Sequence, residues 1–246
     1  MHIAVASNLC GNLPALESFL WELEKLKDGG KVVTKVYIIG ILGPLPCARE
    51  VFTILSKLEN VVLIKGKFDE LILKSDEKLN LELPRYIKDC LRWNLENLGS
   101  EGRRWLMNLK DYHDEKFGEF NFHFRYDNPV EPGEELENNM PQFYYEKIHE
   151  QFKQYKMLFI AGKSSFHVLT QYGKIVSLGP IGFKVKRKNP VFAVIDTDTT
   201  SVSYFEIKFD EFDIKDRLDS VNFPKGLKKS ILRSYTKGNL LDIKIK

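Results

Sequence analysis

The first third of the chain repeats one pattern three times: a short apolar run, a glycine-containing loop and an amphipathic stretch. The apolar runs cover residues 2–6, 35–39 and 61–64, and the amphipathic stretches cover 14–27, about 47–58 and the residues after Gly66. Leucines at helical spacing in 14–27 indicate a helix. Helices that alternate with apolar runs return the chain between strands of one direction, so the pattern predicts a largely parallel sheet.

The rest of the chain changes character. Residues 84–109 have the apolar spacing of helices, with a break at Gly99-Ser100, and residues 120–124 alternate like a strand before a helix-rich insert. Five further strand-like runs cover 157–160, 165–170, 174–176, 191–195 and 202–205. A single open parallel sheet would leave the hairpins formed by these later strands without a hydrophobic core. We therefore predict an α/β (α+β) fold, a four-layer αββα sandwich in which helices flank two mixed β-sheets.

Domain organisation follows from the same patterns. Residues 1–210 are predicted to form the sandwich domain, and residues 211–246 a helical C-terminal tail packed on it. In the tail, Pro224 stands at a helix start, and Leu227, Ile231 and Leu232 share one face. We interpret the tail's lysines and arginines as the solvated outer face of this helix.

Composition excludes several classes of protein. With 37 basic and 34 acidic residues, the net charge of +3 argues against a nucleic-acid partner. The three cysteines form no C-x-x-C pair, which favours a reducing compartment. The N-terminus lacks a signal-peptide pattern, and no apolar run approaches the ~20 residues of a membrane span. We expect a cytoplasmic protein without a membrane partner.

The loops that follow the predicted strands contain the candidate site, because ligands bind at the carboxyl edge of such sheets. They are residues 6–12 (ASNLCGN), 40–44 (GILGP), 66–69 (GKFD), 122–124 (FHF) and 162–165 (GKSS). The last of these is similar to the end of a nucleotide-binding P-loop, but Met157 stands where the first glycine of that motif should be. A P-loop is rejected for that reason.

The order and spacing of these loops resemble the calcineurin-like metallophosphoesterases, particularly their compact prokaryotic phosphodiesterase branch, over roughly residues 1–207. That family reads D-x-H-G-N, G-D, G-N-H-D, H-G and G-H-T-H. Its framework is matched at residues 14–16 (PAL), at Glu50-Val51 and in the loop 179–182. The resemblance implies the sandwich fold and a two-metal phosphoesterase site.

The first two motifs have lost their ligands. The Asp and His of the first motif fall on Asn8 and Cys10, while its Asn is retained as Asn12. The bridging Asp of the second motif falls on Ile41. A hydrocarbon side chain cannot hold two cations ~3.5–4 Å apart.

The later motifs are altered in the same way. The ligating Asn of the third motif falls on Lys67, its catalytic His falls on Phe68, and its Asp is retained as Asp69. The two His of the last motif fall on Lys163 and Ser165. The fourth motif retains His123, although Phe124 replaces its Gly and Arg125-Tyr126 replace a Ser-Pro.

Replacing carboxylates and imidazoles by two lysines predicts that the two-metal site is lost, so we expect no cofactor and no catalytic residue. Two alternatives stay open. A single softer metal such as zinc could bind Asn8, Cys10 and His123, with the thiolate selecting it. A two-residue shift in the last motif would bring His167 into the site.

The two lysines suggest a different role. Their ammonium groups would replace the positive charge of the metals, and the backbone N–H groups of Gly11, Gly66 and Gly162 would add anion donors. We predict a catalytically inactive homologue that binds a phosphate-bearing small molecule or a protein partner in a regulatory role. The alternatives are an active phosphodiesterase or phosphatase with an atypical metal site, and a structural interaction module with an inert cleft.

Overall fold

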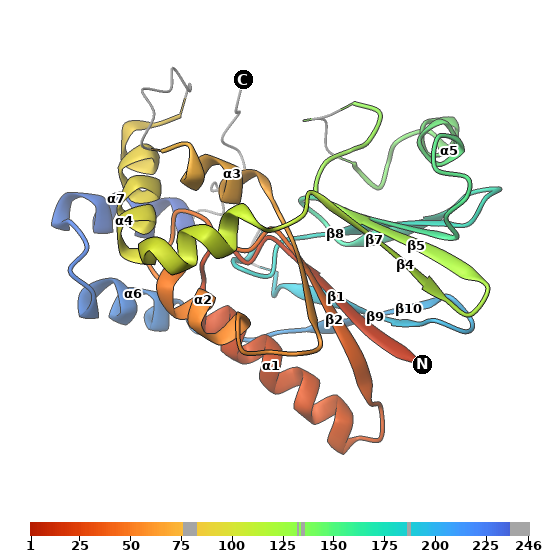
Figure 1. The fold of residues 1–246 in the computed structure, drawn as a ribbon, viewed down its shortest axis with the longest axis horizontal. Helices are drawn as coiled ribbons and strands as arrows, with labels where there is room; N and C mark the ends of the chain where they lie inside the picture. The colour runs from red at the N-terminus through yellow and green to blue at the C-terminus, as the bar shows by residue number, and fades with distance from the viewer. Residues whose placement is uncertain (76–82, 132, 134–135, 186–187, 237–246) are drawn as a thin grey trace.

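The computed structural model describes residues 1–75, 83–131, 133, 136–185 and 188–236. Two five-stranded sheets face one another, and helices cover their outer surfaces (Figure 1). The predicted fold class, with two mixed sheets between helices, is confirmed.

The first sheet is built around β1 (His2–Ser7). This strand pairs in parallel with β2 (Val33–Ile39), which pairs in parallel with β3 (Val61–Ile64). On its other side β1 pairs antiparallel with β9 (Val191–Asp196), the partner of β10 (Ser201–Glu206). The three parallel strands are those predicted from the repeated strand–loop–helix pattern.

The second sheet has the order β4, β5, β6, β8, β7. Its strands are β4 (Tyr112–Phe117), β5 (Phe120–Arg125), β6 (Met157–Ala161), β7 (Phe166–Leu169) and β8 (Lys174–Leu178). β5, β6 and β8 are parallel to one another, so their carboxyl ends share one edge.

Seven helices occur in the described part of the chain. They are α1 (Leu13–Asp28), α2 (Ala48–Leu55), α3 (Lys67–Leu73), α4 (Arg85–Met107), α5 (Gln142–Glu150), α6 (Glu211–Ser220) and α7 (Lys225–Thr236). The expected break at Gly99 is present inside α4, where this glycine adopts φ 71° and interrupts the helical backbone. The division into domains at residue 210 stays a prediction, and residues 237–246 of the expected tail lie outside the described residues.

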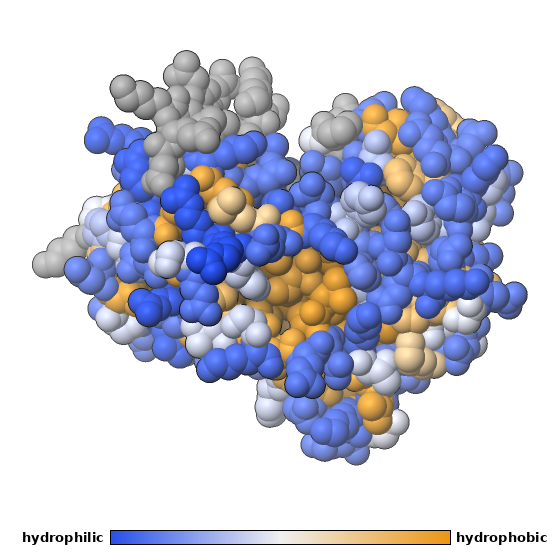
Figure 2. Space-filling view, viewed as in Figure 1, coloured by the Kyte–Doolittle hydropathy of each residue, from blue (hydrophilic) through white to orange (hydrophobic). Residues whose placement is uncertain are grey.

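Three hydrophobic clusters hold the layers together. The largest fills the space between the first sheet and the helices α1, α2, α3, α4, α6 and α7. A second lies between the two sheets, and a third lies under α5 on the outer face of the second sheet. On the face shown in Figure 2, the surface is mostly polar, with one apolar area near its centre.

Strand β4 is the element that the sequence did not predict. Its sequence YHDEKF is polar, because the strand lies at the edge of its sheet and alternate residues are exposed. Glu115 on this strand accepts hydrogen bonds from Lys35 (2.7 Å) and from the Tyr37 hydroxyl (2.6 Å), and so links the two sheets. No helix among the described residues is long and apolar enough to cross a membrane.

Candidate functional site

The loops at the carboxyl ends of the strands meet at one end of the sandwich. The backbone N–H of Leu9 donates to Gly40 O (3.0 Å), and that of Gly40 donates to Ile64 O (2.9 Å), which joins the loops after β1, β2 and β3. The loop after β8 is attached through Gly182, whose N–H donates to Asn8 O (3.0 Å). The predicted convergence of loops from both sheets is therefore present.

Asn8 lies at the centre of this meeting point. Its side-chain amide donates to Gly162 O at 3.5 Å, which ties the loop after β1 to the loop after β6. Both Asn8 (φ 51°) and Cys10 (φ 56°) adopt left-handed backbone conformations, which non-glycine residues rarely do. Asn tolerates this region well, because its short polar side chain bonds locally.

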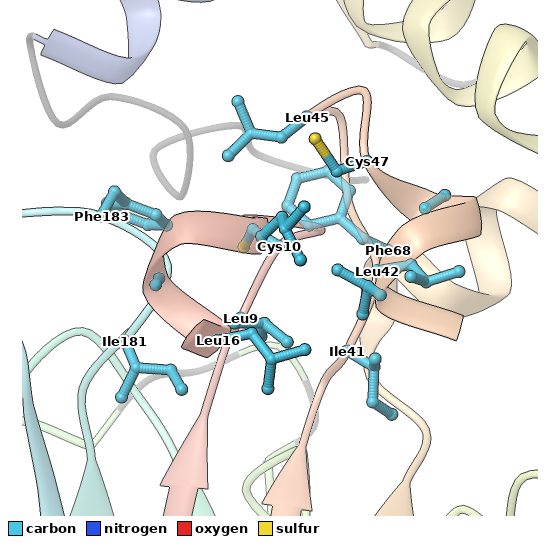
Figure 3. Close-up of a cluster of buried hydrophobic side chains, with 14 of the residues drawn as sticks. Leu9, Cys10, Leu16, Ile41, Leu42, Leu45, Cys47, Phe68, Ile181 and Phe183 are labelled. Carbon is cyan, nitrogen blue, oxygen red and sulfur yellow. The ribbon is translucent and has the colours of Figure 1, made fainter. Parts of the chain in front are cut away.

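Three site positions contribute to the hydrophobic core instead of to a polar pocket. Cys10, Ile41 and Phe68 all belong to the cluster that packs against the helices, and Ile41 is fully buried. Figure 3 shows them among Leu9, Leu42, Leu45 and Ile181. Burial raises the pKa of the Cys10 thiol, and the nearby Asp69 carboxylate raises it further. The sulfur is therefore held as the thiol, a poor metal ligand.

Asp69 has no solvent exposure, and its carboxylate accepts three backbone hydrogen bonds. Oδ2 accepts from Ile41 N (3.0 Å) and Gly66 N (2.7 Å), and Oδ1 accepts from Leu42 N (2.7 Å). One side chain thus fixes the loops after β2 and β3. Burial raises the pKa of this carboxyl to about 6, while the three amide donors and Lys65 oppose that rise.

The side chain of Asn12 also forms hydrogen bonds with the backbone of neighbouring segments. Its Oδ1 accepts from Ala15 N (3.0 Å) at the start of α1, as an N-cap residue does. Its Nδ2 donates to Gly182 O (2.6 Å) and lies 3.3 Å from the Tyr235 hydroxyl of α7. Asn12 therefore connects the first loop to the loop after β8 and to the last helix.

The remaining loop positions are half-buried and polar. Lys67 begins α3, Lys163 follows Gly162, and Ser165 accepts a hydrogen bond from Gly179 N (2.8 Å) through its hydroxyl. Lys67 and Lys163 follow Gly66 and Gly162, the glycines bonded to Asp69 and Asn8. The two lysines thus extend from neighbouring loops of the same end.

His123 does not join these residues. Its strand neighbours Phe122 and Phe124 face the core between the sheets, so His123 faces the outer side of the second sheet. There its Nδ1 lies 2.5 Å from Asp114 Oδ1, and its ring packs against Tyr112, Phe152 and Tyr155. Burial lowers the pKa of His123, with Asp114 opposing the effect. The expectation that His123 belongs to the site is not met by its position.

His167 lies neither among these loops nor beside His123. It is exposed on β7 and its ring stacks on Tyr204, 6.0 Å between centroids. The alternative alignment that would bring it into the site is not supported by this position.

Tyr126 is the site residue that the sequence analysis missed. It is the first residue after β5, and its ring lies against the backbone of Gly40 and Gly66. A Cβ atom at Gly66 would lie 2.5 Å from Gly40 Cα and 2.9 Å from this ring. The two loops can therefore pack this closely against the ring only because residues 40 and 66 are both glycine. Tyr126 is half-buried and packs on the core between the sheets.

The comparisons with known proteins agree with this geometry. Hypothetical protein PH1004 from Pyrococcus horikoshii OT3 is 36% identical, over 93% of this chain and 96% of that one, with a TM-score of 0.83. A metallophosphoesterase from Sphaerobacter thermophilus has the same fold at 16% identity, over 96% and 99% of the chains, with a TM-score of 0.67. No protein-family model and no curated protein matches the sequence. The chain belongs to the same family as PH1004, and its fold is similar to that of the metallophosphoesterases.

The metallophosphoesterase motifs also explain why Tyr126 was missed. If the family's H-G-S-P stretch is moved three residues along, Tyr126 takes the place of the His and Pro129 falls on the Pro. His123 was matched to the family's ligand because it is a histidine. Pro129 was the signal that could have corrected this.

The two metal ions of a metallophosphoesterase do not fit the residues present. Asn8 is buried and its side-chain amide donates to Gly162 O, while Cys10, Ile41 and Phe68 are core residues. Within the described ranges, no group of three or more His, Cys, Asp or Glu side chains is placed to hold an ion. The described residues of this metallophosphoesterase-like fold therefore do not provide a donor set for two metal ions.

The expected backbone anion donors are also committed elsewhere. The N–H groups of Gly11, Gly66 and Gly162 donate to Ile41 O, Asp69 Oδ2 and Leu178 O, at 2.9, 2.7 and 2.7 Å. The prediction that these glycines offer free donors to a phosphate was wrong, because the close packing of the loops uses each of them. These three amides are therefore not available to an anion.

Proposed function

We propose that this metallophosphoesterase homologue is non-catalytic and acts in a binding or regulatory role. The observation that supports this most strongly is the packing of Cys10, Ile41 and Phe68 in one hydrophobic cluster. Hydrolysis by this fold needs anionic or imidazole ligands at such positions to hold two ions and a nucleophilic water. A core side chain cannot move out to bind an ion without leaving a cavity, which typically costs ~2–5 kcal/mol.

Its ligand, in this proposal, carries a phosphate group that Lys67 and Lys163 recognise. Both lysines start from loops of the same end, and both are half-buried. Lysine binds phosphate as a flexible point charge and needs no preformed fork. With the glycine amides occupied, the two side chains would supply the positive charge.

The absence of catalysis is tested on purified protein. Elemental analysis would be followed by an assay of a phosphodiester, bis(p-nitrophenyl) phosphate, with added manganese. We expect no stoichiometric metal and no turnover above buffer. Stoichiometric metal with turnover that Asn8→Ala abolishes and His123→Ala preserves would overturn the proposal, because only Asn8 lies among the loops.

Phosphate recognition is tested by thermal stability, since a ligand that binds the folded state raises Tm. Inorganic phosphate should raise Tm of the wild type, and Lys67→Ala and Lys163→Ala should each reduce that rise. Lys57→Ala is the matched control, because Lys57 is exposed after α2 and makes the same change in net charge. If phosphate raises the Tm of all three variants equally, the two lysines do not bind it, and the alternative of an interaction module with an inert cleft is favoured.

A further inference from the structure

We propose that the outer edge of β10 is an interface for a second copy of this chain. The β10 strands of the two copies pair antiparallel and join the two first sheets into one continuous sheet. The inference concerns a surface outside the candidate site, and it does not depend on the ligand proposed above.

Three of the four sheet edges have features that hinder the addition of another strand. The edge of β3 is partly covered, because Lys65 N donates to Lys110 O (2.8 Å) beside it. Strand β4 has charged side chains at residues 114–116. Strand β7 has only four residues, and Leu169 O already accepts a hydrogen bond from the Gln142 side chain (2.7 Å). Covering segments, charges and short strands are the means by which proteins protect sheet edges.

Strand β10 has none of these features within the described part of the chain. It has six residues, and residues 201–205 carry no charge. Because Ile207 N donates to Pro190 O (2.9 Å), the register of β9 and β10 turns every second residue of β10 away from β9. These outward residues are Val202, Tyr204 and Glu206. Their N–H and C=O groups bond to no described residue, so this edge can accept another strand.

Antiparallel pairing of two β10 strands about a twofold axis uses all of these groups. If Tyr204 of one copy lies opposite Tyr204 of the other, Val202 of each copy lies opposite Glu206 of the other. In this register every outward N–H and C=O group of both strands forms a hydrogen bond. The same surface then serves both copies, as a twofold interface requires.

The charges at the two ends of the edge favour a second copy over an unrelated strand. Near the start of β10, the Lys174 ammonium group donates to Thr200 O. At its end, the exposed Glu206 accepts from the Asn189 amide (3.2 Å), which does not neutralise its charge. Val202 packs on the cluster between the sheets, so Glu206, four residues on, lies on this same face, toward Lys174. The pairing brings Glu206 of each copy beside Lys174 of the other, and forms this ion pair twice.

The experiment is sedimentation velocity of the full chain over a range of protein concentrations. We expect the wild type to form a dimer of twice the mass of one chain, with a Kd that rises as salt is added. Glu206→Lys and Lys174→Glu each place like charges across the interface, so each should raise this Kd at least about tenfold. Near-ultraviolet circular dichroism checks that both variants are folded.

Mixing the two variants is the decisive measurement, because opposite charges then face one another again at both ends of the edge. We expect the mixture to form a heterodimer with the affinity of the wild type. Glu101→Lys is the matched control, since it makes the same change of charge at an exposed position of α4 and should dimerise as the wild type does.

A wild type that stays monomeric at every concentration would overturn the inference and leave the edge to a strand of another protein. A dimer that neither single variant weakens would overturn it as well, because its interface would lie elsewhere. So would a mixture of the two variants that stays monomeric, since the two edges would then not pair in this register.

Discussion

The two halves of the site differ in what replaced the family's ligands. On the first sheet, the loops after β1, β2 and β3 are closed, with Cys10, Ile41 and Phe68 in the hydrophobic core. On the second sheet, Ser165, Lys163 and Tyr126 are half-buried and polar or aromatic. The comparison shows that most ligand positions on the first sheet belong to the hydrophobic core, with the half-buried Lys67 as an exception, while those on the second sheet have side chains that are not fully buried.

The retained residues follow the same division. Asn12 and Asp69 survive from the family motifs, and both bond to backbone groups of neighbouring loops. Positions whose family role is to hold a metal have changed, and positions that hold the loops have not.

Asp69→Ala should lower the free energy of unfolding by about 5 kcal/mol at pH 7, because three buried N–H groups lose their acceptor at about 1–3 kcal/mol each. Urea denaturation measures the change. Asp69→Asn keeps the volume and one acceptor oxygen, so it should cost less. Equal stability of Asp69→Ala and wild type would show that the carboxylate does not hold the loops.

Ile41→Asp restores the chemistry of the family's bridging ligand, but it buries a charge in the hydrophobic core. We expect a loss of about 4 kcal/mol, since Ile41 is fully buried and its surroundings are apolar. The decisive measurement is Tm with and without manganese. Rescue of Tm by the ion would mean that a metal site persists, and the two halves would then not differ as described.

The Asp69 carboxyl also predicts a pH dependence. Its pKa is about 6 in the folded protein and 3.8 is its ordinary value, so the folded state binds more protons between these values. Stability should therefore fall as pH rises from about 4 to about 6, by about 3 kcal/mol relative to Asp69→Asn. Parallel pH profiles of the two proteins would contradict this.

Asn12→Ala removes the N-cap of α1 and the bond to Gly182, and should cost about 2 kcal/mol. Tyr235→Phe is the matched change on the other side of the contact. It removes only the hydroxyl and should cost less than about 1 kcal/mol, as judged by thermal unfolding. A larger loss in Tyr235→Phe would mean that α7, and not the cap, supports the loop.

Lys67→Ala should change the free energy of unfolding by less than about 0.5 kcal/mol, because Lys67 is only half-buried and does not belong to the hydrophobic core. Chemical denaturation without phosphate measures this. A loss like that of Asp69→Ala would mean that Lys67, like Cys10, Ile41 and Phe68, belongs to the hydrophobic scaffold of the first sheet.

The fold could be predicted further than the site. Apolar periodicity located the parallel strands, because burial imposes a period on the sequence, and the Gly99-Ser100 pair indicated the break in α4. The polar strand β4 has no such signal, and only its pairing with β5 defines it. At the site, the motif order identified the loops, but the choice of His123 over Tyr126 depended on which face of β5 turns inward. Moving the H-G-S-P motif by three residues changes which face of the strand its first position occupies, and the residue types alone do not indicate that move.

The contact between Asn12 and Tyr235 joins two residues that are 223 positions apart. A chain emerging from the ribosome can form β1, the first loop and α1 early, yet the amide of Asn12 acquires this partner only after residue 235 has been added. Synthesis thus delays the completion of the first loop until α7 has been made. Shortened chains that end before α7 should carry an unfinished first loop, whatever the state of their sheets.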